Sequence, residues 1–409
     1  MNQGQVVRVF LAFAFAYFLS TLVRAITATL SPTLIDEFSL QARDLGLLAG
    51  GYFLGFAFTQ LPMGRWLDSH GPRKVLCAML LFAVLGSVTF SVATEFNHLL
   101  IARLLTGVGV SACLMAPLTG FRRWLPATSQ VRANSWMLMT GSLGMLASTL
   151  PVQWLLPAIG WRPIFLGVAV LNVVAIAWLW RQIPNWNTDE ASRPSAPTAS
   201  SEGLWQSYVP VWRNRYFQRL APFAFFVYGG MIAMQTLWAG PWMIKVSGYS
   251  PLESATGLFW INVVMLFTFW GWGLVTPRLA QMGWDPNRLM AWGLPLNLVA
   301  VAWLVVQGPG TGALAWSVYF VTCSIVSLAQ PAIGLAFPSH LAGRALSAYN
   351  LLIFAGVFLM QWGFGWLIDL GAALDLSVPM RFQMAMACLG GTTVLSVLWF
   401  AWRRADNGT

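Results

Sequence analysis

The stretch Gly64-Arg65-Trp66-Leu67-Asp68-Ser69-His70-Gly71-Pro72-Arg73-Lys74 decides the fold. It separates two long apolar runs, 46–63 and 75–93. At a rise of about 1.5 Å per residue, each run can cross a bilayer core of about 30 Å. So short a connection makes the two helices antiparallel, and its three cations favour the cytoplasmic side. We expect Gly64 and Gly71 to allow a tight reversal and Pro72 to start the next helix.

The composition is that of a membrane protein. Of 409 residues, 57% are hydrophobic and only 9% are charged, whereas a soluble domain carries about 25% charged residues. The net charge of +10 does not indicate nucleic acid, because the cations are spread over alternate loops. The four cysteines and three histidines form no nucleophile or metal-ligand grouping. We therefore predict no catalytic residues, no metal site, no cofactor and no enzyme activity.

Apolar runs along the chain predict twelve membrane helices. We place them at 9–31, 46–66, 74–94, 97–122, 132–158, 161–183, 217–244, 254–276, 288–306, 312–337, 344–369 and 379–402. Between the sixth and seventh runs, small polar residues and prolines predict a linker. The chain then divides into an N-terminal six-helix bundle over 1–184, a linker over 185–216 and a C-terminal six-helix bundle over 217–409.

The distribution of cations predicts the orientation. With the N-terminus inside, most of the 23 Lys and Arg residues fall in cytoplasmic segments. Only a few fall in outer segments, and Arg24 and Arg103 fall within spans. Because positive loops stay on the cytoplasmic side, we predict a multi-pass protein of the cell inner (plasma) membrane. Both termini and the linker are then cytoplasmic.

Three motifs indicate a family. The opening stretch has the pattern Gly-x-x-x-Asp-x-x-Gly-x-Arg-Lys and resembles the signature loop of the major facilitator superfamily of secondary transporters. Arg103-Leu104-Leu105-Thr106-Gly107-Val108-Gly109 resembles the arginine motif of that superfamily's fourth helix, and Gly160-Trp161-Arg162 the start of its sixth. The fifth predicted helix, however, lacks the Gly-Pro element of the superfamily's drug antiporters.

The resemblance implies an all-α membrane protein of twelve transmembrane helices in two pseudo-symmetric six-helix bundles. It also implies alternating access around a central cavity that helices one and four both line. The signature loop would act as a conformational gate, in which Asp68 couples the cytoplasmic ends of the two halves. The gate residues are then Gly64, Asp68, Gly71, Arg73 and Lys74.

Two arginines within spans are the strongest candidates for substrate binding. Arg24 lies about 10 Å and Arg103 about 9 Å below the outer ends of their predicted spans. No Asp or Glu lies deep in any predicted span, and an arginine fork matches carboxylate or phosphate oxygens. Two alternatives stay open. Arg103 can serve structure or proton coupling, and Arg24 can bond backbone carbonyls as a snorkelling residue.

Helical spacing extends this candidate site. Tyr17 and Arg24 lie two turns apart on one face of span one, and Tyr228 and Gln235 share that spacing on span seven, followed by Trp238. Helix packing explains single residues of these stripes equally well, and Trp238 also suits a membrane interface. The predicted substrate contacts are Arg24, Tyr17, Arg103, Tyr228, Gln235 and Trp238.

We therefore predict a secondary active transporter that moves a small organic anion or zwitterion by alternating access. The alternative is proton-coupled efflux of drug-like compounds. The expected partners are a small anionic substrate, a coupling proton as a candidate, and the lipid bilayer. We expect a monomer without a nucleic-acid partner.

Overall fold

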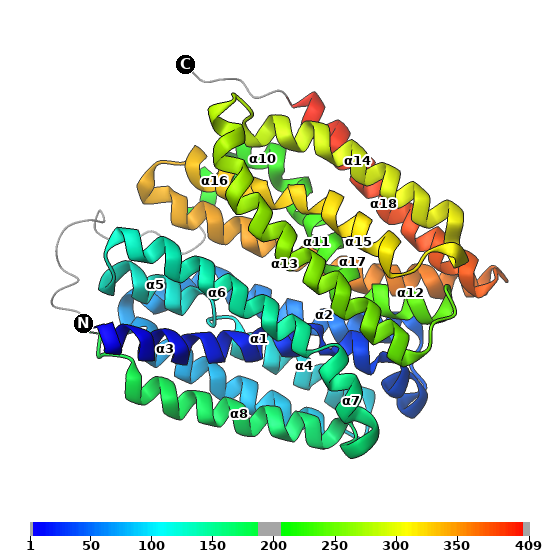
Figure 1. Ribbon diagram of the computed structural model, residues 1–409, viewed down its shortest axis with the longest axis horizontal. Coiled ribbons are helices and arrows are strands. Elements are labelled where there is room, and N and C mark those ends of the chain that lie inside the picture. The colour runs from blue at the N-terminus through cyan, green and yellow to red at the C-terminus, as the bar shows by residue number, and fades with distance from the viewer. Residues whose placement is uncertain (1–2, 187–205, 404–409) are drawn as a thin grey trace. The chain divides into compact units, whose positions relative to one another are not determined.

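The structure, a computed structural model, is built of helices (Figure 1). It describes residues 3–186 and 206–403, apart from the side chains of 127, 128, 131, 339 and 340. Within this part of the chain, 10 helices are long and apolar enough to cross a membrane, or 11 if one bent pair counts as a span. A further predicted span corresponds to α2 (Ala42–Phe58) and the start of α3 (Gln60–Ser91). The predicted all-α membrane class is confirmed.

The chain divides into two compact units, which we describe separately. The first comprises Met1–Thr27 and Gly51–Ser201, and the second comprises Ala28–Gly50 and Glu202–Thr409. Two helices, α1 (Gln3–Phe38) and α2, therefore contribute to both units. The predicted bundle boundaries stay a prediction.

The first unit is organised around α3, which packs against α4 and α8. Glycines allow the close approach, since a Cβ on Gly109 of α4 would lie 2.2 Å from the backbone nitrogen of Ala83. Two of its helices, α6 and α7, bend by 41° at their junction. Besides α3, its helices are α4 (Phe96–Val110), α5 (Met115–Trp124), α6 (Ala127–Ala147), α7 (Leu150–Ile159) and α8 (Trp161–Gln182).

Local capping explains where several helices of the second unit begin. Ser250 and Glu253 form a capping box at α13, and the Asp285 side chain accepts a bond from the Arg288 amide at α14. The elements are η2 (Gln206–Tyr208), α9 (Val209–Arg213), α10 (Arg215–Pro222), η3 (Phe223–Tyr228), α11 (Gly229–Ala233), η4 (Met234–Trp238), α12 (Ala239–Lys245), α13 (Pro251–Gln281), α14 (Pro286–Gln307), η5 (Gly308–Gly310), α15 (Ala313–Cys323), η6 (Ser324–Leu328), α16 (Ala329–Ala336), α17 (Ser339–Ala373) and α18 (Val378–Trp402).

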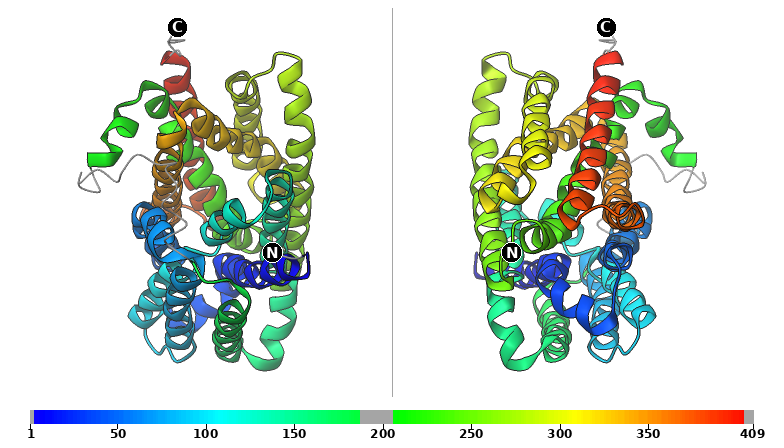
Figure 2. Two further views of the ribbon diagram at one scale, coloured as in Figure 1. Left: turned by 90° about the vertical axis from the view of Figure 1, so that its left-hand side faces the viewer. Right: turned by 90° about the vertical axis from the view of Figure 1, so that its right-hand side faces the viewer.

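The end of the predicted linker is helical. Most of the range 185–216 lies outside the described residues, but η2 and α9 follow at 206–213 and contact α17 (Figure 2). Tyr208 and Val211 are buried there. Apolar side chains at this end explain the difference from the prediction, because they bury surface that the polar residues before them cannot.

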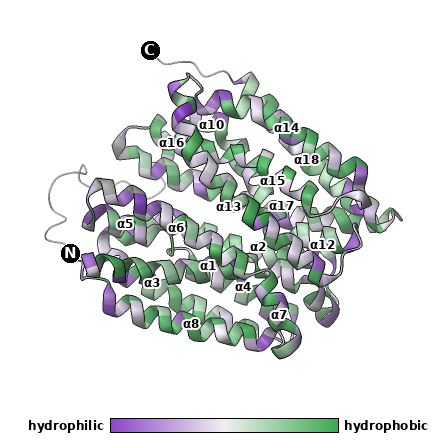
Figure 3. Ribbon diagram, viewed as in Figure 1, coloured by the Kyte–Doolittle hydropathy of each residue, from purple (hydrophilic) through white to green (hydrophobic). Residues whose placement is uncertain are grey.

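Large apolar side chains cover the outside of the helices. Trp260, Trp270 and Trp292 are each more than half exposed, as are many Leu and Val residues. Hydrophobic residues line the middles of the helices, while hydrophilic residues gather toward their ends (Figure 3). Such a surface is unfavourable in water and suits the hydrocarbon core of a membrane.

Candidate functional site

Arg103 is the one charged residue among the fully buried side chains of the described chain. It lies on α4 and is 1% exposed. Its Nη1 donates a hydrogen bond of 2.8 Å to the carbonyl oxygen of Val23 on α1. Its guanidinium carbon lies 5.1 Å from the centre of the Tyr52 ring. Burying a charge is unfavourable unless partners compensate for the lost water, so the remaining donors of Arg103 are informative.

Those remaining donors form a fork. Nε and Nη2 of Arg103 are buried and have no hydrogen-bond partner within the described residues. These two nitrogens lie on one edge of the guanidinium, where their N–H groups point in parallel. This is the edge that binds both oxygens of a carboxylate or phosphate.

Arg24 lies in the same region of the first unit. Arg103 bonds to the carbonyl of Val23, the residue directly before Arg24, so Arg103 reaches the turn of α1 that carries Arg24. Arg24 is half-buried, and its guanidinium carbon lies 5.8 Å from the centre of the Phe56 ring. Tyr52 and Phe56 are one turn apart on α2, with ring centres 6.3 Å apart. Each arginine therefore lies over one member of an aromatic pair.

Other helices hold this turn of α1 in place. The Tyr52 hydroxyl donates to the Ser20 carbonyl at 3.2 Å. On α6, a Cβ on Gly141 would lie 2.6 Å from the Tyr17 ring, and a Cβ on Gly144 would lie 2.1 Å from the Thr21 hydroxyl. The candidate residue Tyr17 is itself buried. Three of the six predicted contacts, Tyr17, Arg24 and Arg103, thus lie on neighbouring faces of α1 and α4.

Sequence reasoning missed Tyr52 and Phe56. Their spacing of four residues on a glycine-rich helix was an available signal, because Gly51 and Gly55 let α2 approach α4 closely. A Cβ on Gly55 would lie 2.2 Å from the Leu104 carbonyl, and one on Gly107 would lie 1.9 Å from the Tyr52 carbonyl. These close contacts of Gly51, Gly55 and Gly107 between α2 and α4, which we call the glycine seam, fix both rings beside α4.

Two of the other three predicted contacts, Gln235 and Trp238, belong to a neutral cluster in the second unit. Gln235 donates to the Asn262 side chain at 3.0 Å. Trp238 is fully buried, and its indole donates to the Gln361 carbonyl at 3.0 Å. Gln361 in turn donates to the Thr236 hydroxyl at 2.9 Å. The amide and indole nitrogens of this cluster are thus satisfied within the unit.

The seventh span departs from a regular α-helix. Two segments, η3 and η4, are π-helical, with α11 between them. Tyr228 ends the first π segment and is half-buried, while Gln235 and Trp238 lie in the second. The two-turn α-helical spacing expected for Tyr228 and Gln235 therefore holds only for span one. Segments of π-helix are common at functional sites.

The signature loop packs against the end of the sixth span. Gly71 has φ of 77°, and a Cβ there would lie 2.3 Å from the Trp186 Cβ. The Trp186 indole donates to the Asp68 carbonyl at 3.2 Å. Arg73 donates to the Ile183 carbonyl at 3.4 Å and lies 4.4 Å from the Trp180 ring. Gly71 is therefore required for two reasons: its backbone conformation favours glycine, and Trp186 packs where a Cβ would lie.

Gly64 does not take part in the reversal, contrary to the sequence prediction. It lies within helical residues of α3, is exposed, and has no neighbour within 4 Å of an added Cβ. The helix continues past it and breaks only at Gly71, and Pro72 follows in the first turn of the next helical stretch as expected. Asp68 and Lys74 are exposed, whereas Arg73 is half-buried.

Comparisons with known proteins agree with this architecture. Residues 13–361 match the family described as Major Facilitator Superfamily. The whole chain superposes on a bacterial homologue of the human lysosomal transporter Spinster with a TM-score of 0.78 and 17% identity, covering 98% of both chains.

Curated relatives are distant. The gallate transporter of Pseudomonas putida is 24% identical over 402 residues, which is 91% of this chain and 82% of that protein. The galacturonate transporter of Dickeya chrysanthemi is 25% identical, covering 76% of this chain and 92% of that protein. A Cupriavidus necator protein named "Probable sulfoacetate transporter" is 24% identical, and the match spans only 56% of its length.

Proposed function

Because the chain belongs to the Major Facilitator Superfamily of transporters, we propose that this secondary transporter moves a small organic anion by alternating access. The observation that carries the proposal is the buried Nε/Nη2 edge of Arg103, which has no partner within the described residues. A carboxylate binds such an edge with two parallel hydrogen bonds. In our proposal Arg103 holds the carboxylate, and Arg24 adds a second positive charge at the same turn of α1.

The aromatic pair gives the proposal a second support. Tyr52 and Phe56 lie beside the two guanidinium groups, and in our proposal the body of the ligand packs against these rings. Polar groups that fix orientation, set in an apolar wall, are typical of small-molecule sites.

The relatives' names agree with an anionic substrate. The gallate and galacturonate transporters are named for compounds that each carry one carboxylate. Gallate is aromatic and galacturonate is a sugar acid. The names therefore support a negatively charged substrate but do not indicate the structure of its uncharged part. Zwitterions stay within the proposal, because they also present a carboxylate.

The alternative, efflux of drug-like compounds, has less support. A buried acid would favour a cationic drug, and no Asp or Glu is among the buried side chains of residues 3–186 and 206–403. Both charged residues of the proposed site, Arg24 beside Phe56 and Arg103 beside Tyr52, are arginines. An anion fits this site better than a cation.

Binding to the purified full-length protein tests the proposal. The probes are gallate and galacturonate, each compared with its neutral counterpart, gallamide or galactose, in thermal-shift and calorimetric titrations. We expect at least one carboxylate to raise the melting temperature and its neutral counterpart not to. Stabilisation by cationic drugs but by neither carboxylate would overturn the proposal.

A charge-conserving variant sharpens this test. Arg24→Lys keeps the positive charge and loses the fork, so Kd for the carboxylate should rise about 10- to 100-fold, which is about 1–3 kcal/mol. Arg162→Lys is the matched control, because Arg162 donates to the Ala93 carbonyl and takes no part in the proposed site. Equal affinity of Arg24→Lys and the parent would contradict the role of Arg24.

We also propose the orientation that the charge distribution predicts, with both termini and the segment 185–216 in the cytoplasm. Single cysteines between 189 and 201, in a background without the four native cysteines, should react with a membrane-impermeant maleimide only after the cells are opened. Labelling of intact cells at these positions would reverse the orientation.

For the signature loop we propose a gating role. Asp68 is exposed, and its carbonyl rather than its carboxylate binds Trp186, so the carboxylate is available for a contact that forms during the cycle. Asp68→Asn should insert normally and reduce transport several-fold, measured as flux into proteoliposomes. Unchanged flux in Asp68→Asn would contradict the gating role.

A further inference from the structure

The beginning of α2 lacks a good cap of its own. The residue before the helix is Gln41, whereas Ser, Thr, Asp and Asn are the preferred N-cap residues. The first amide groups of any helix have no partner within it. The Asp44 carboxylate turns back to the Gln41 amide at 3.1 Å, which leaves the amides of Ala42 and Arg43 to be satisfied from elsewhere.

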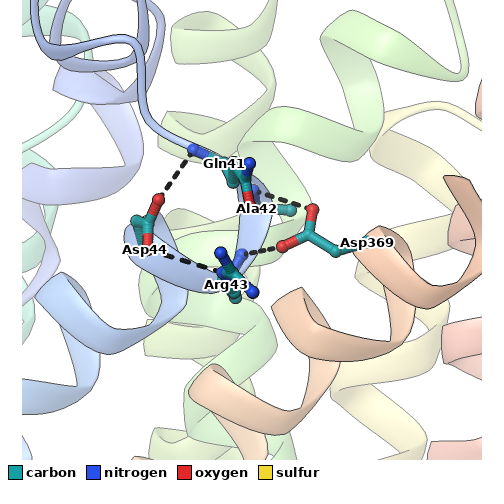
Figure 4. A network of polar contacts seen from close by, with 5 residues as sticks. All are labelled: Gln41, Ala42, Arg43, Asp44 and Asp369. Carbon is teal, nitrogen blue, oxygen red and sulfur yellow. Dashed lines mark hydrogen bonds and ion pairs between the residues drawn. The ribbon is translucent and has the colours of Figure 1, made fainter. Parts of the chain in front are cut away.

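Asp369 on α17 supplies the missing cap. Its Oδ1 accepts a bond from the Ala42 amide at 3.1 Å, and its Oδ2 accepts one from the Arg43 amide at 2.9 Å (Figure 4). Both carboxylate oxygens therefore lie at the positive end of the helix dipole. The bonds come from backbone amides, while the Arg43 side chain lies 3.8 Å from the Asp44 carboxylate.

Glycines bring α2 and α17 close enough for this cap. A Cβ on Gly46 would lie 2.3 Å from the Gln361 carbonyl, and one on Gly365 would lie 2.3 Å from the Ala42 carbonyl. One turn further along α2, a Cβ on Gly50 would lie 3.0 Å from the Phe358 ring. The first half of α2 thus meets α17 backbone to backbone, and Asp369 lies one turn beyond Gly365.

The second half of α2 has a different neighbour. Gly51 and Gly55 face α4, and the chain from Gly51 onward belongs to the first unit, whereas Ala28–Gly50 belong to the second. The Asp369 carboxylate, with its bonds to Ala42 and Arg43, is the polar contact between the start of α2 and α17. Alternation between conformations requires some helix contacts to change, and a helix shared by both units is one place where they can change.

We propose that Asp369 is a conformational clamp of the transport cycle. Its carboxylate caps α2 and holds the start of that helix on α17, in the state described here, and opening the side of the protein at the α1–α2 connection requires this cap to break. The proposal assumes only that this protein is a transporter, as its family is. It does not depend on the substrate or on either arginine.

Distances between spin labels test the clamp without any substrate. Labels replace the exposed residues Gln41 and Leu374 in a background without native cysteines, and double electron–electron resonance reports their separation in nanodiscs. The parent should have one dominant short distance. Asp369→Ala should lower its share at least about twofold in favour of longer distances, because the two amides of α2 lose their acceptors.

Two controls isolate the cap. Asp375→Asn removes the same charge at the same end of α17, where a φ of 55° is tolerated by Asn, and should leave the distances unchanged. Arg43→Ala should also leave them unchanged, because the Arg43 backbone amide makes the bond. If Arg43→Ala lengthens the distance as Asp369→Ala does, the contact is an ion pair and the capping proposal is wrong.

Gly365→Ala gives an independent route to the same state. Its methyl group would meet the Ala42 carbonyl, so the helices must separate and the long distance should again gain population. Asp369→Asn keeps the shape of the side chain and is therefore less prone to misfold than Asp369→Ala. It has only one acceptor oxygen, so it should shift the distances in the same direction as Asp369→Ala. An unchanged distribution in Asp369→Ala and Asp369→Asn would overturn the proposal, even if carboxylate binding is established.

Discussion

The two polar clusters within the helices differ in charge and in how fully they are satisfied. In the first unit, Arg103 uses Nη1 for one bond and leaves a two-nitrogen edge without a protein partner. In the second unit, the side-chain nitrogens of Gln235, Gln361 and Trp238 all have acceptors. Within the described residues, the second cluster leaves only the neutral Gln361 Oε1 without a partner. The charged edge of Arg103 is more costly to leave unsatisfied and is therefore better suited to a ligand.

The largest expected effect is on Arg103. Arg103→Met keeps much of the volume of the side chain and removes the fork, so Kd for the carboxylate should rise about 100-fold or more. The free protein should lose little thermal stability, because removing a buried charge also removes its desolvation cost. Calorimetry and thermal unfolding of the same sample measure both. Retained binding with lost flux would instead make Arg103 a coupling residue.

The next largest effect is expected on protein stability, from the packing of α6 against α1. In Gly144→Ala, the added methyl group would meet the Thr21 hydroxyl and the Phe18 carbonyl, which we expect to destabilise the protein by about 1–3 kcal/mol. Gly167→Ala is the matched control, since nothing lies within 4 Å of a Cβ on that helical glycine, and it should stabilise slightly. Equal melting temperatures of the two variants would show that α6 does not hold α1.

A smaller effect is expected from Tyr52. Tyr52→Phe removes the hydroxyl that bonds the Ser20 carbonyl and keeps the ring beside Arg103. Loss of one neutral hydrogen bond, about 0.5–1.5 kcal/mol, should weaken carboxylate binding by only a few-fold. Tyr52→Leu removes the ring as well and should weaken it further. Equal affinities of these two variants would exclude a role of the ring.

The smallest effect on binding is expected in the neutral cluster. Gln235→Leu leaves the Asn262 Oδ1 without its donor and should cost about 1–2 kcal/mol of stability, with less than about a twofold change in Kd. Adding Asn262→Leu should recover part of that stability, because neither polar partner is then left alone. A tenfold loss of affinity in Gln235→Leu would make this cluster a substrate contact, as the sequence predicts, and would remove the difference between the clusters.

Much of the fold could be predicted because membrane helices leave long apolar runs that short charged loops separate. The loop around Gly71 could be recognised from its residues, since the positive φ there requires glycine. The sequence could not show that Gly64 differs from Gly71. The two glycines differ in backbone conformation, which is helical at Gly64 and has a positive φ at Gly71. The π-helical segments of the seventh span carry no local sequence signal that we could use.

The charged residues of the candidate site could be predicted from the sequence, whereas the residues packed around them could not. Arg24 and Arg103 stand out because ionised residues are rare within spans. The bond from Arg103 to the Val23 carbonyl joins α4 to α1, and the place of the aromatic pair depends on the glycine seam between α2 and α4. A seam of this kind is a property of two helices together, so it cannot be found by considering each span alone. The same holds for Asp369, whose partners lie more than three hundred residues away in the chain.

The bond from Arg103 to Val23 has a consequence for biogenesis. An arginine at the centre of a helix raises the free energy of insertion through the translocon by about 2.5–3.5 kcal/mol, and one nearer the end, as Arg103 is in its span, raises it by less. The acceptor for Arg103 lies on α1, which is synthesised before α4 and can already be in the bilayer when α4 arrives. The fourth span should therefore depend on the first for its retention in the membrane, and a nascent chain without α1 should release α4 to quality-control proteases.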